Sequence, residues 1–126
     1  MNNFLLYTSI ISGFIILLII YNTYNPNYDI LYLFVFLGII TSILNHGSHS
    51  TTYKYMDRLI IVLNVFVFIY FINQTKNEQK EYKISIIFFA CFLYLLSKLQ
   101  KNIILRNILH SLCHFLTVIL LYLLPI

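Results

Sequence analysis

Five long apolar runs separated by short polar loops dominate this 126-residue sequence. A helix needs about 20 residues, each rising about 1.5 Å, to cross the hydrocarbon part of a bilayer, and somewhat shorter apolar runs also suffice when flanking side chains reach the interface. The five runs cover residues 4–21, 29–47, 57–73, 82–98 and 102–124. The sequence therefore predicts an all-α integral membrane bundle of five transmembrane helices, which form a single transmembrane domain over residues 1–126.

Composition favours a membrane protein over a water-soluble one. The chain is 60% hydrophobic and only 10% charged, and its mean hydropathy is +0.85. A soluble domain is about 45–50% apolar and about 25% charged. The net charge is +4, but the basic residues are scattered in the loops, which is typical of membrane flanks and not of a nucleic-acid surface. We therefore expect membrane lipids to be the main partners and expect no nucleic-acid partner.

The basic residues also predict how the protein is oriented. An odd number of spans places the N-terminus on the same side as the second and fourth loops. Four basic residues fall on that side and three on the other: Lys54, Arg58, Lys98 and Lys101 against Lys76, Lys80 and Lys83. Because basic loops tend to remain in the cytoplasm, this distribution predicts a multi-pass membrane protein with a cytoplasmic N-terminus.

Several ionisable residues lie in or beside the apolar runs, where insertion of a charged group costs about 2.5–3.5 kcal/mol. In the second run, Ser42 and His46 are four residues apart, so they share one helix face. Asp57 begins the third run, and His110 and His114 in the fifth run are again four apart. Antiparallel spans place all five residues in the same half of the bilayer. These side chains can therefore form one cluster.

The chemistry of this cluster points to zinc. Three neutral imidazoles are a suitable ligand set for Zn²⁺ and leave a fourth position for water, whose pKa the ion lowers to about 7. We therefore predict that His46, His110 and His114 bind zinc. Asp57 would act as the general base that activates the zinc-bound water, and Ser42 would bond to that water or to the oxyanion.

Each of these residues also has a structural interpretation. Paired histidines can join helices by hydrogen bonds, and Ser42 can bond to a carbonyl of its own helix. Asp57 can be a helix cap or can form a surface ion pair with Arg58. Arg106, four residues before His110, can extend to the interface; alternatively, it is a substrate-binding residue for a lipid phosphate or a carboxylate.

The order of Ser42 and His46, then Asp57, then His110 and His114 resembles the CREST superfamily of membrane hydrolases. This superfamily includes alkaline ceramidases, adiponectin-receptor-like proteins and GPI-remodelling relatives. The step of eleven residues from His46 to Asp57 looks most like the ceramidase branch and its GPI-processing neighbours. The resemblance implies that the three histidines bind zinc, that Asp57 and Ser42 hold and activate its water, and that the reaction is hydrolysis of an amide or ester bond in a sphingolipid or phospholipid.

The chain departs from that family in helix number, because the family core has seven helices and five are predicted here. Two helices fewer between the third and the last leave the direction of the last helix unchanged. A smaller bundle has less wall to enclose an acyl chain, so the chain would form a homo-oligomer, use lipid as part of the wall, or lack activity.

The leading prediction is a zinc-dependent, ceramidase-like lipid hydrolase embedded in the membrane. The alternative is a non-catalytic membrane interaction protein that keeps the polar cluster as interhelical glue. A third interpretation is a small transporter or channel subunit in which Arg106 and the histidines line a path. The lack of helices broken by glycine or proline argues mildly against that third interpretation.

Overall fold

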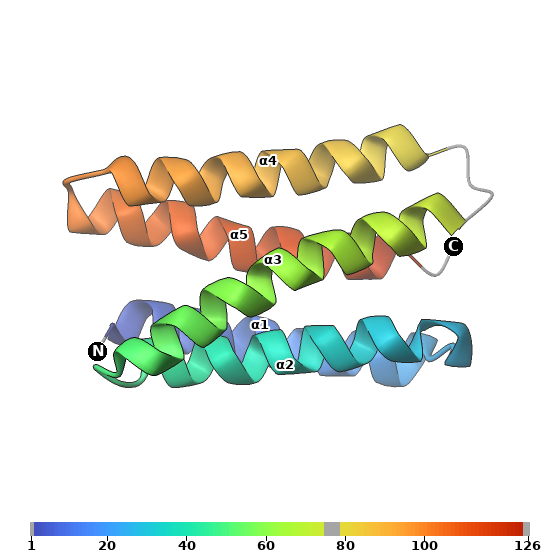
Figure 1. Ribbon diagram of the computed structural model, residues 1–126, viewed down its shortest axis with the longest axis horizontal. Helices are drawn as coiled ribbons and strands as arrows, with labels where there is room; N and C mark the ends of the chain where they lie inside the picture. Colours follow the sequence, from blue (N-terminus) through green and yellow to red (C-terminus); the bar gives the residue numbers. More distant parts are fainter. Residues whose placement is uncertain (1, 75–78, 125–126) are drawn as a thin grey trace.

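The computed structural model describes residues 2–74 and 79–124, and these residues form a helical bundle (Figure 1). Within those ranges there are five α-helices and no strand. The elements are α1 (Asn3–Thr23), a short 3-10 turn η1 (Pro26–Tyr28), α2 (Asp29–His46), α3 (Thr51–Gln74), α4 (Lys80–Leu99) and α5 (Ile103–Leu123). All five α-helices are long and apolar enough to cross a membrane. The predicted all-α fold of five membrane-spanning helices is confirmed.

The third helix begins earlier than predicted. α3 begins at Thr51, although its apolar run begins at Asp57. Hydropathy marks only the part of a helix that lies in hydrocarbon, whereas the helix itself continues through polar residues at the interface. As a result, Asp57 lies nearly two turns inside α3 instead of at its mouth. The other predicted bounds agree within two residues, and Lys76, used in the orientation argument, lies outside the described residues.

Asparagine side chains cap the N-terminal ends of two helices, α1 and α5. The Asn2 side chain accepts a hydrogen bond from the Leu5 amide at the start of α1, and Asn102 accepts from the Ile104 and Leu105 amides at the start of α5. These bonds satisfy backbone N–H groups that have no partner within the helix. Short, capped connections of this kind force consecutive helices to run antiparallel.

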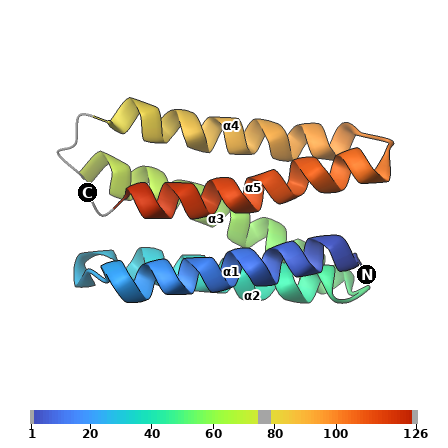
Figure 2. The same ribbon diagram turned by 180° about the vertical axis from the view of Figure 1, so that it is seen from behind.

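The five helices are arranged as two antiparallel pairs with one crossing helix. α1 packs against α2, and α4 packs against α5, while α3 crosses obliquely from α2 toward α4 (Figure 1). Seen from behind, α1 and α5 lie on the near face, and these two helices also contact each other (Figure 2). The starts of α1, α3 and α5 and the ends of α2 and α4 therefore meet at one end, which we call the N-terminal end of the bundle.

Two glycines allow the helices of this arrangement to approach closely. A Cβ atom on Gly13 of α1 would lie 2.7 Å from Cγ2 of Ile39 on α2. A Cβ atom on Gly38 of α2 would lie 3.0 Å from Nδ2 of Asn64 on α3. Small residues at such crossings are typical of membrane helices, whose association depends on close packing and not on a hydrophobic driving force.

The apolar core and the buried polar residues occupy different halves of the bundle. The core lies in the half away from the N-terminal end and consists of Ile16, Leu31, Val35, Phe68, Phe71, Ile72, Ile87, Leu120, Leu121 and Leu124. The buried polar residues of the other half are Ser9, Ser12, Thr41, His46, Asp57, Ser97, His110 and Ser111. The second group contains three of the five residues that the sequence singles out, namely His46, Asp57 and His110, while Ser42 and His114 are half-buried.

Candidate metal centre

The three predicted zinc ligands converge at the N-terminal end. His46 is the last residue of α2, and His110 and His114 lie one turn apart near the start of α5. One ligand nitrogen from each ring lies within 4.8 Å of the other two. The ring centroids are 5.0 Å apart for His46 and His110, 5.9 Å for His46 and His114, and 5.0 Å for His110 and His114. Two non-consecutive helices thus present three imidazoles to one small volume.

The donor set fits a metal ion that prefers nitrogen ligands. Zinc binds imidazole nitrogen at about 2.0–2.1 Å, so three such nitrogens around one tetrahedral ion lie roughly 3.4 Å apart. Small rotations of the rings bring nitrogens from within 4.8 Å to that spacing. In addition, Nε2 of His46 is buried and has no hydrogen-bond partner among the described residues. A buried polar nitrogen without a partner is costly, and a coordinated cation would satisfy it.

A threonine of α1 determines which nitrogen of His114 faces a metal. The Thr8 hydroxyl donates to the Leu5 carbonyl at 3.0 Å, and its oxygen lies 3.4 Å from Nδ1 of His114. Because the Thr8 hydroxyl donates to Leu5, its oxygen accepts from His114 in the tautomer that carries the proton on Nδ1. That tautomer leaves the Nε2 lone pair of His114 available as a ligand. Hydrogen bonds of this kind commonly orient metal-binding histidines.

Asp57 is held by α2 and not by a surface partner. Asn45 donates to its Oδ2 atom at 2.9 Å, and the Thr41 hydroxyl lies 3.5 Å from its Oδ1 atom. The residue is only 3% exposed. The alternative of a cap or surface ion pair therefore does not describe Asp57, whose carboxylate is buried and accepts a hydrogen bond from Asn45 of the neighbouring helix.

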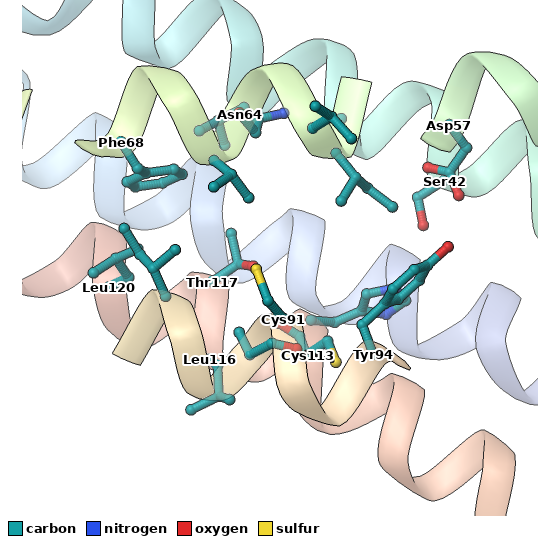
Figure 3. Close-up of a pocket in the computed structure, with 18 of the residues that line it drawn as sticks. Ser42, Asp57, Asn64, Phe68, Cys91, Tyr94, Cys113, Leu116, Thr117 and Leu120 are labelled. Atoms are coloured by element: carbon teal, nitrogen blue, oxygen red, sulfur yellow. Dashed lines mark hydrogen bonds between the residues drawn. The ribbon is translucent and has the colours of Figure 1, made fainter. Parts of the chain in front are cut away.

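Ser42 contacts α1 across the helix interface. Its Oγ atom lies 2.8 Å from Oγ of Ser9, a distance that allows either hydroxyl to donate. Ser42 and Asp57 lie close together at one end of a large cavity, and the ring of Tyr94 on α4 extends across the cavity toward them (Figure 3). The ring of Tyr94 also contacts that of His110, with centroids 5.5 Å apart. Polar groups from four helices, those of Ser9, Ser42, Asp57 and Tyr94, thus line the same cavity as His114.

The cavity that Ser42 and Asp57 line has a volume of about 620 Å³, and residues from all five helices form its wall. Ser42 and Asp57 line one end of it, and mostly apolar side chains such as Phe68 and Leu120 line the other end (Figure 3). His114 also lines the cavity. Pockets for small molecules typically measure about 300–1,000 Å³. Five helices are therefore sufficient to form an apolar cavity that leads to the histidine cluster.

A second hollow, of about 480 Å³, adjoins the first and shares Arg58, Tyr94 and Lys98 with it. His46 and His110 line it, and so does Arg106, which is exposed on α5. The predicted substrate-binding residue is therefore near the cluster but outside the apolar cavity. Its neighbours in this hollow include three further basic side chains, those of Lys54, Arg58 and Lys98.

Sequence reasoning missed three residues that shape the site, namely Thr8, Asn45 and Tyr94. A signal existed for Thr8, since Thr8, Ser9 and Ser12 are polar residues in an otherwise apolar run and fall in the same half of the bilayer as the histidines. Tyr94 carried no such signal, because it is one of 11 tyrosines and most of them suggest interface belts.

Comparison with known proteins adds no relative. No protein-family model, curated protein or solved structure matches this chain. The chemistry open to the site therefore follows from its own geometry. The site combines three imidazoles, a buried carboxylate and an apolar cavity.

Proposed function

We propose that this chain is a zinc-dependent hydrolase of lipid amide or ester bonds, a shortened, ceramidase-like member of the CREST superfamily. One observation carries the proposal. Imidazoles from α2 and α5 place three ligand nitrogens within 4.8 Å of one another, and the buried Nε2 atom of His46 has no partner in the described part of the chain. Structural histidines would instead be expected to satisfy their nitrogens with neighbouring groups.

Each residue of the site has a role in this reaction. His46, His110 and His114 hold the ion, and Thr8 orients the ring of His114. A zinc ion held by these residues would lower the pKa of a bound water to about 7 and would polarise the substrate carbonyl. Asp57 accepts the proton of the attacking water and returns it to the leaving amine or alkoxide.

The remaining polar groups position the reactants. The bond from Asn45 keeps the carboxylate of Asp57 in one orientation. If Ser9 donates to Ser42, the proton of the Ser42 hydroxyl is free to point into the cavity, where it can stabilise an oxyanion. The apolar cavity takes the acyl chain of the substrate. With the N-terminus in the cytoplasm, the reaction takes place in the cytoplasmic half of the bilayer.

The competing interpretation, that the polar cluster joins helices without catalysis, explains other residues better than the histidines. Asn2 donates to Asn107 at 2.9 Å, and Asn64 donates to the Phe34 carbonyl at 3.0 Å. These bonds join α1 to α5 and α3 to α2, as interhelical glue should. By contrast, Nε2 of His46 has no hydrogen-bond partner among residues 2–74 and 79–124, so this atom does not join two helices there.

The experiment is elemental analysis of protein purified in detergent without chelators, combined with a lipid hydrolysis assay. We expect about one zinc per chain, loss of zinc and of fatty-acid release in His110→Ala, and no loss of either in His49→Ala. His49 is an exposed loop residue and provides the matched histidine control. Protein without zinc, or equal zinc in both variants, would overturn the proposal. Normal folding with no change in any lipid product would favour the interaction protein.

A further inference from the structure

The hollow beside His46 and His110 is strongly basic. Four cationic side chains line it: Lys54 and Arg58 from α3, Lys98 from α4 and Arg106 from α5. No acidic residue is among its lining residues in the described ranges. We call this hollow the basic pocket. Because four like charges around one volume of about 480 Å³ repel one another, the pocket favours an anion.

The basic pocket and the apolar cavity share part of their lining. Arg58, Tyr94 and Lys98 line both spaces. Of the three imidazoles, those of His46 and His110 line the basic pocket, whereas that of His114 lines the apolar cavity. A molecule that reaches from one space into the other passes Arg58, Tyr94 and Lys98, and each space has at least one imidazole of the cluster in its wall.

The cations are arranged for an anionic group with several oxygen atoms. Two of the four are arginines, whose planar guanidinium groups bind phosphate oxygens in pairs, and two are lysines, which act as point charges. Lys98 is held with its Nζ atom 4.9 Å above the ring of Tyr94, so its ammonium group is not freely extended into water. The carboxylate of Asp57 interacts electrostatically with Arg58 and Lys98, whereas a neutral head group, such as the free hydroxyls of ceramide, would add no negative charge to the pocket.

We propose that the substrate is an acyl lipid whose head group carries a phosphate. The inference rests on the proposed function. The phosphate lies in the basic pocket, the acyl chain lies in the apolar cavity, and the carbonyl carbon lies at the histidine cluster between them. In lipids such as ceramide 1-phosphate and phosphatidic acid, only a few bonds separate the phosphate from the acyl carbonyl, so one molecule has its parts in the required order.

The reaction balances with water as the only co-reactant. The water oxygen forms a bond to the carbonyl carbon, and the bond from that carbon to nitrogen or oxygen breaks. The proton that Asp57 takes from the water passes to the leaving nitrogen or oxygen. The products are a fatty acid and an amine or alcohol that still carries the phosphate.

A simpler explanation is that these basic residues only flank the membrane, as many do at helix ends. Lys101 provides the internal comparison. It lies at the same end of the bundle, in the loop between α4 and α5, but it does not line the basic pocket. If the charges act merely as membrane flanks, removal of Lys101 and removal of Arg106 should have equal effects.

The test is lipid binding by the full chain, purified in detergent and treated with chelator so that no turnover interferes. Short-chain ceramide 1-phosphate is compared with ceramide of the same acyl length, and phosphatidic acid with diacylglycerol. We expect the phosphorylated member of at least one pair to bind at least tenfold more tightly, and higher salt to reduce that preference. Arg106→Gln and Lys54→Gln should each weaken phospholipid binding about tenfold, and Lys101→Gln should leave it unchanged.

Each outcome bears on the inference. Equal affinity for phosphorylated and neutral lipids, or equal effects of Arg106→Gln and Lys101→Gln, would overturn it. Inorganic phosphate that binds as tightly as the phosphorylated lipids would identify a free anion as the ligand and would also overturn it. Hydrolysis of neutral lipids alone would leave the proposed function intact while refuting the head group. A preserved phosphate preference in a protein that never binds zinc would refute only the proposed function.

Discussion

The two halves of the bundle are built from the same apolar helices but bury different kinds of side chain. The half away from the N-terminal end buries leucine, isoleucine and phenylalanine, with Leu31 and Ile72 fully covered. The half at the N-terminal end buries serine, threonine, histidine and aspartate. Lys83, buried near the start of α4, is an exception to this division among the described residues.

This difference indicates that the polar half carries the function and that the apolar half stabilises the bundle. Buried polar groups in a membrane half are expensive unless each is paired, so their concentration at one end indicates a purpose beyond packing. The apolar half holds the core that joins the helices, and part of that core also lines the apolar cavity. If this division is correct, substitutions in the two halves should have separable effects on metal content, turnover and stability.

The largest effect should come from removal of a metal ligand. His110→Ala should eliminate zinc and lower fatty-acid release by about 10³-fold or more, because the activation of water by the ion is lost. The same variant should change thermal unfolding in detergent less than it changes turnover. Metal content and a melting curve on one preparation check both statements. If His110→Ala keeps its zinc, the division between the halves fails.

The next largest effect should come from removal of the proposed general base, which should lower turnover without loss of zinc. Asp57→Asn should lower turnover by about 10²–10⁴-fold while one zinc per chain remains, since general base catalysis contributes about that factor. Asp29→Asn is the matched control, because Asp29 begins α2 at the opposite end and accepts a bond from Tyr24. Steady-state rates and metal content of the two variants measure this effect. Equal rates for the two variants would remove Asp57 from the reaction.

In the apolar half the expected effect is on stability alone. Ile72→Ala should lower the free energy of unfolding by about 2 kcal/mol, because a buried side chain is replaced by a cavity while lipid offers little transfer energy. Leu33→Ala is the control, since Leu33 is 55% exposed and faces lipid or solvent. Unfolding in mixed detergent micelles measures the difference. Loss of zinc in the folded Ile72→Ala protein would show that the halves are not independent.

The smallest effect concerns the residue that orients a ligand. Thr8→Val keeps the shape of the side chain but removes the acceptor for Nδ1 of His114. Loss of such a bond typically lowers metal affinity 10–100-fold, and the 3.4 Å length of this bond suggests the lower value, about tenfold. Competition with a zinc chelator measures the affinity. Thr23→Val, at the far end of α1, should match the unmodified protein.

The sequence predicts much of this molecule because two signals in it are strong. Runs of apolar residues set the number of helices, and spacings of four residues with antiparallel topology place His46, His110 and His114 in one half of the bilayer. These two patterns alone are enough to predict the five-helix fold that the structure confirms. The early start of α3 escaped prediction because hydropathy reports the hydrocarbon core and not the full helix.

The rotation of each helix about its axis could not be predicted. Lipid tails and protein interior are equally apolar, so hydropathy does not distinguish the two faces of a membrane helix. On α1 the buried residues include Ser9, Ser12 and Gly13, while Phe14 is 63% exposed. For that reason the contact of Thr8 with His114, the clamp of Asn45 on Asp57 and the basic pocket from three helices emerged only in three dimensions.

The central claim is that three imidazoles hold one zinc ion, and X-ray absorption at the zinc edge tests it most directly. The proposal predicts about three nitrogen ligands and one oxygen ligand at about 2.0–2.1 Å in the unmodified protein. It also predicts that this signal disappears in His46→Ala and persists in His49→Ala. A sulfur shell at about 2.3 Å, or an unchanged spectrum in His46→Ala, would contradict it.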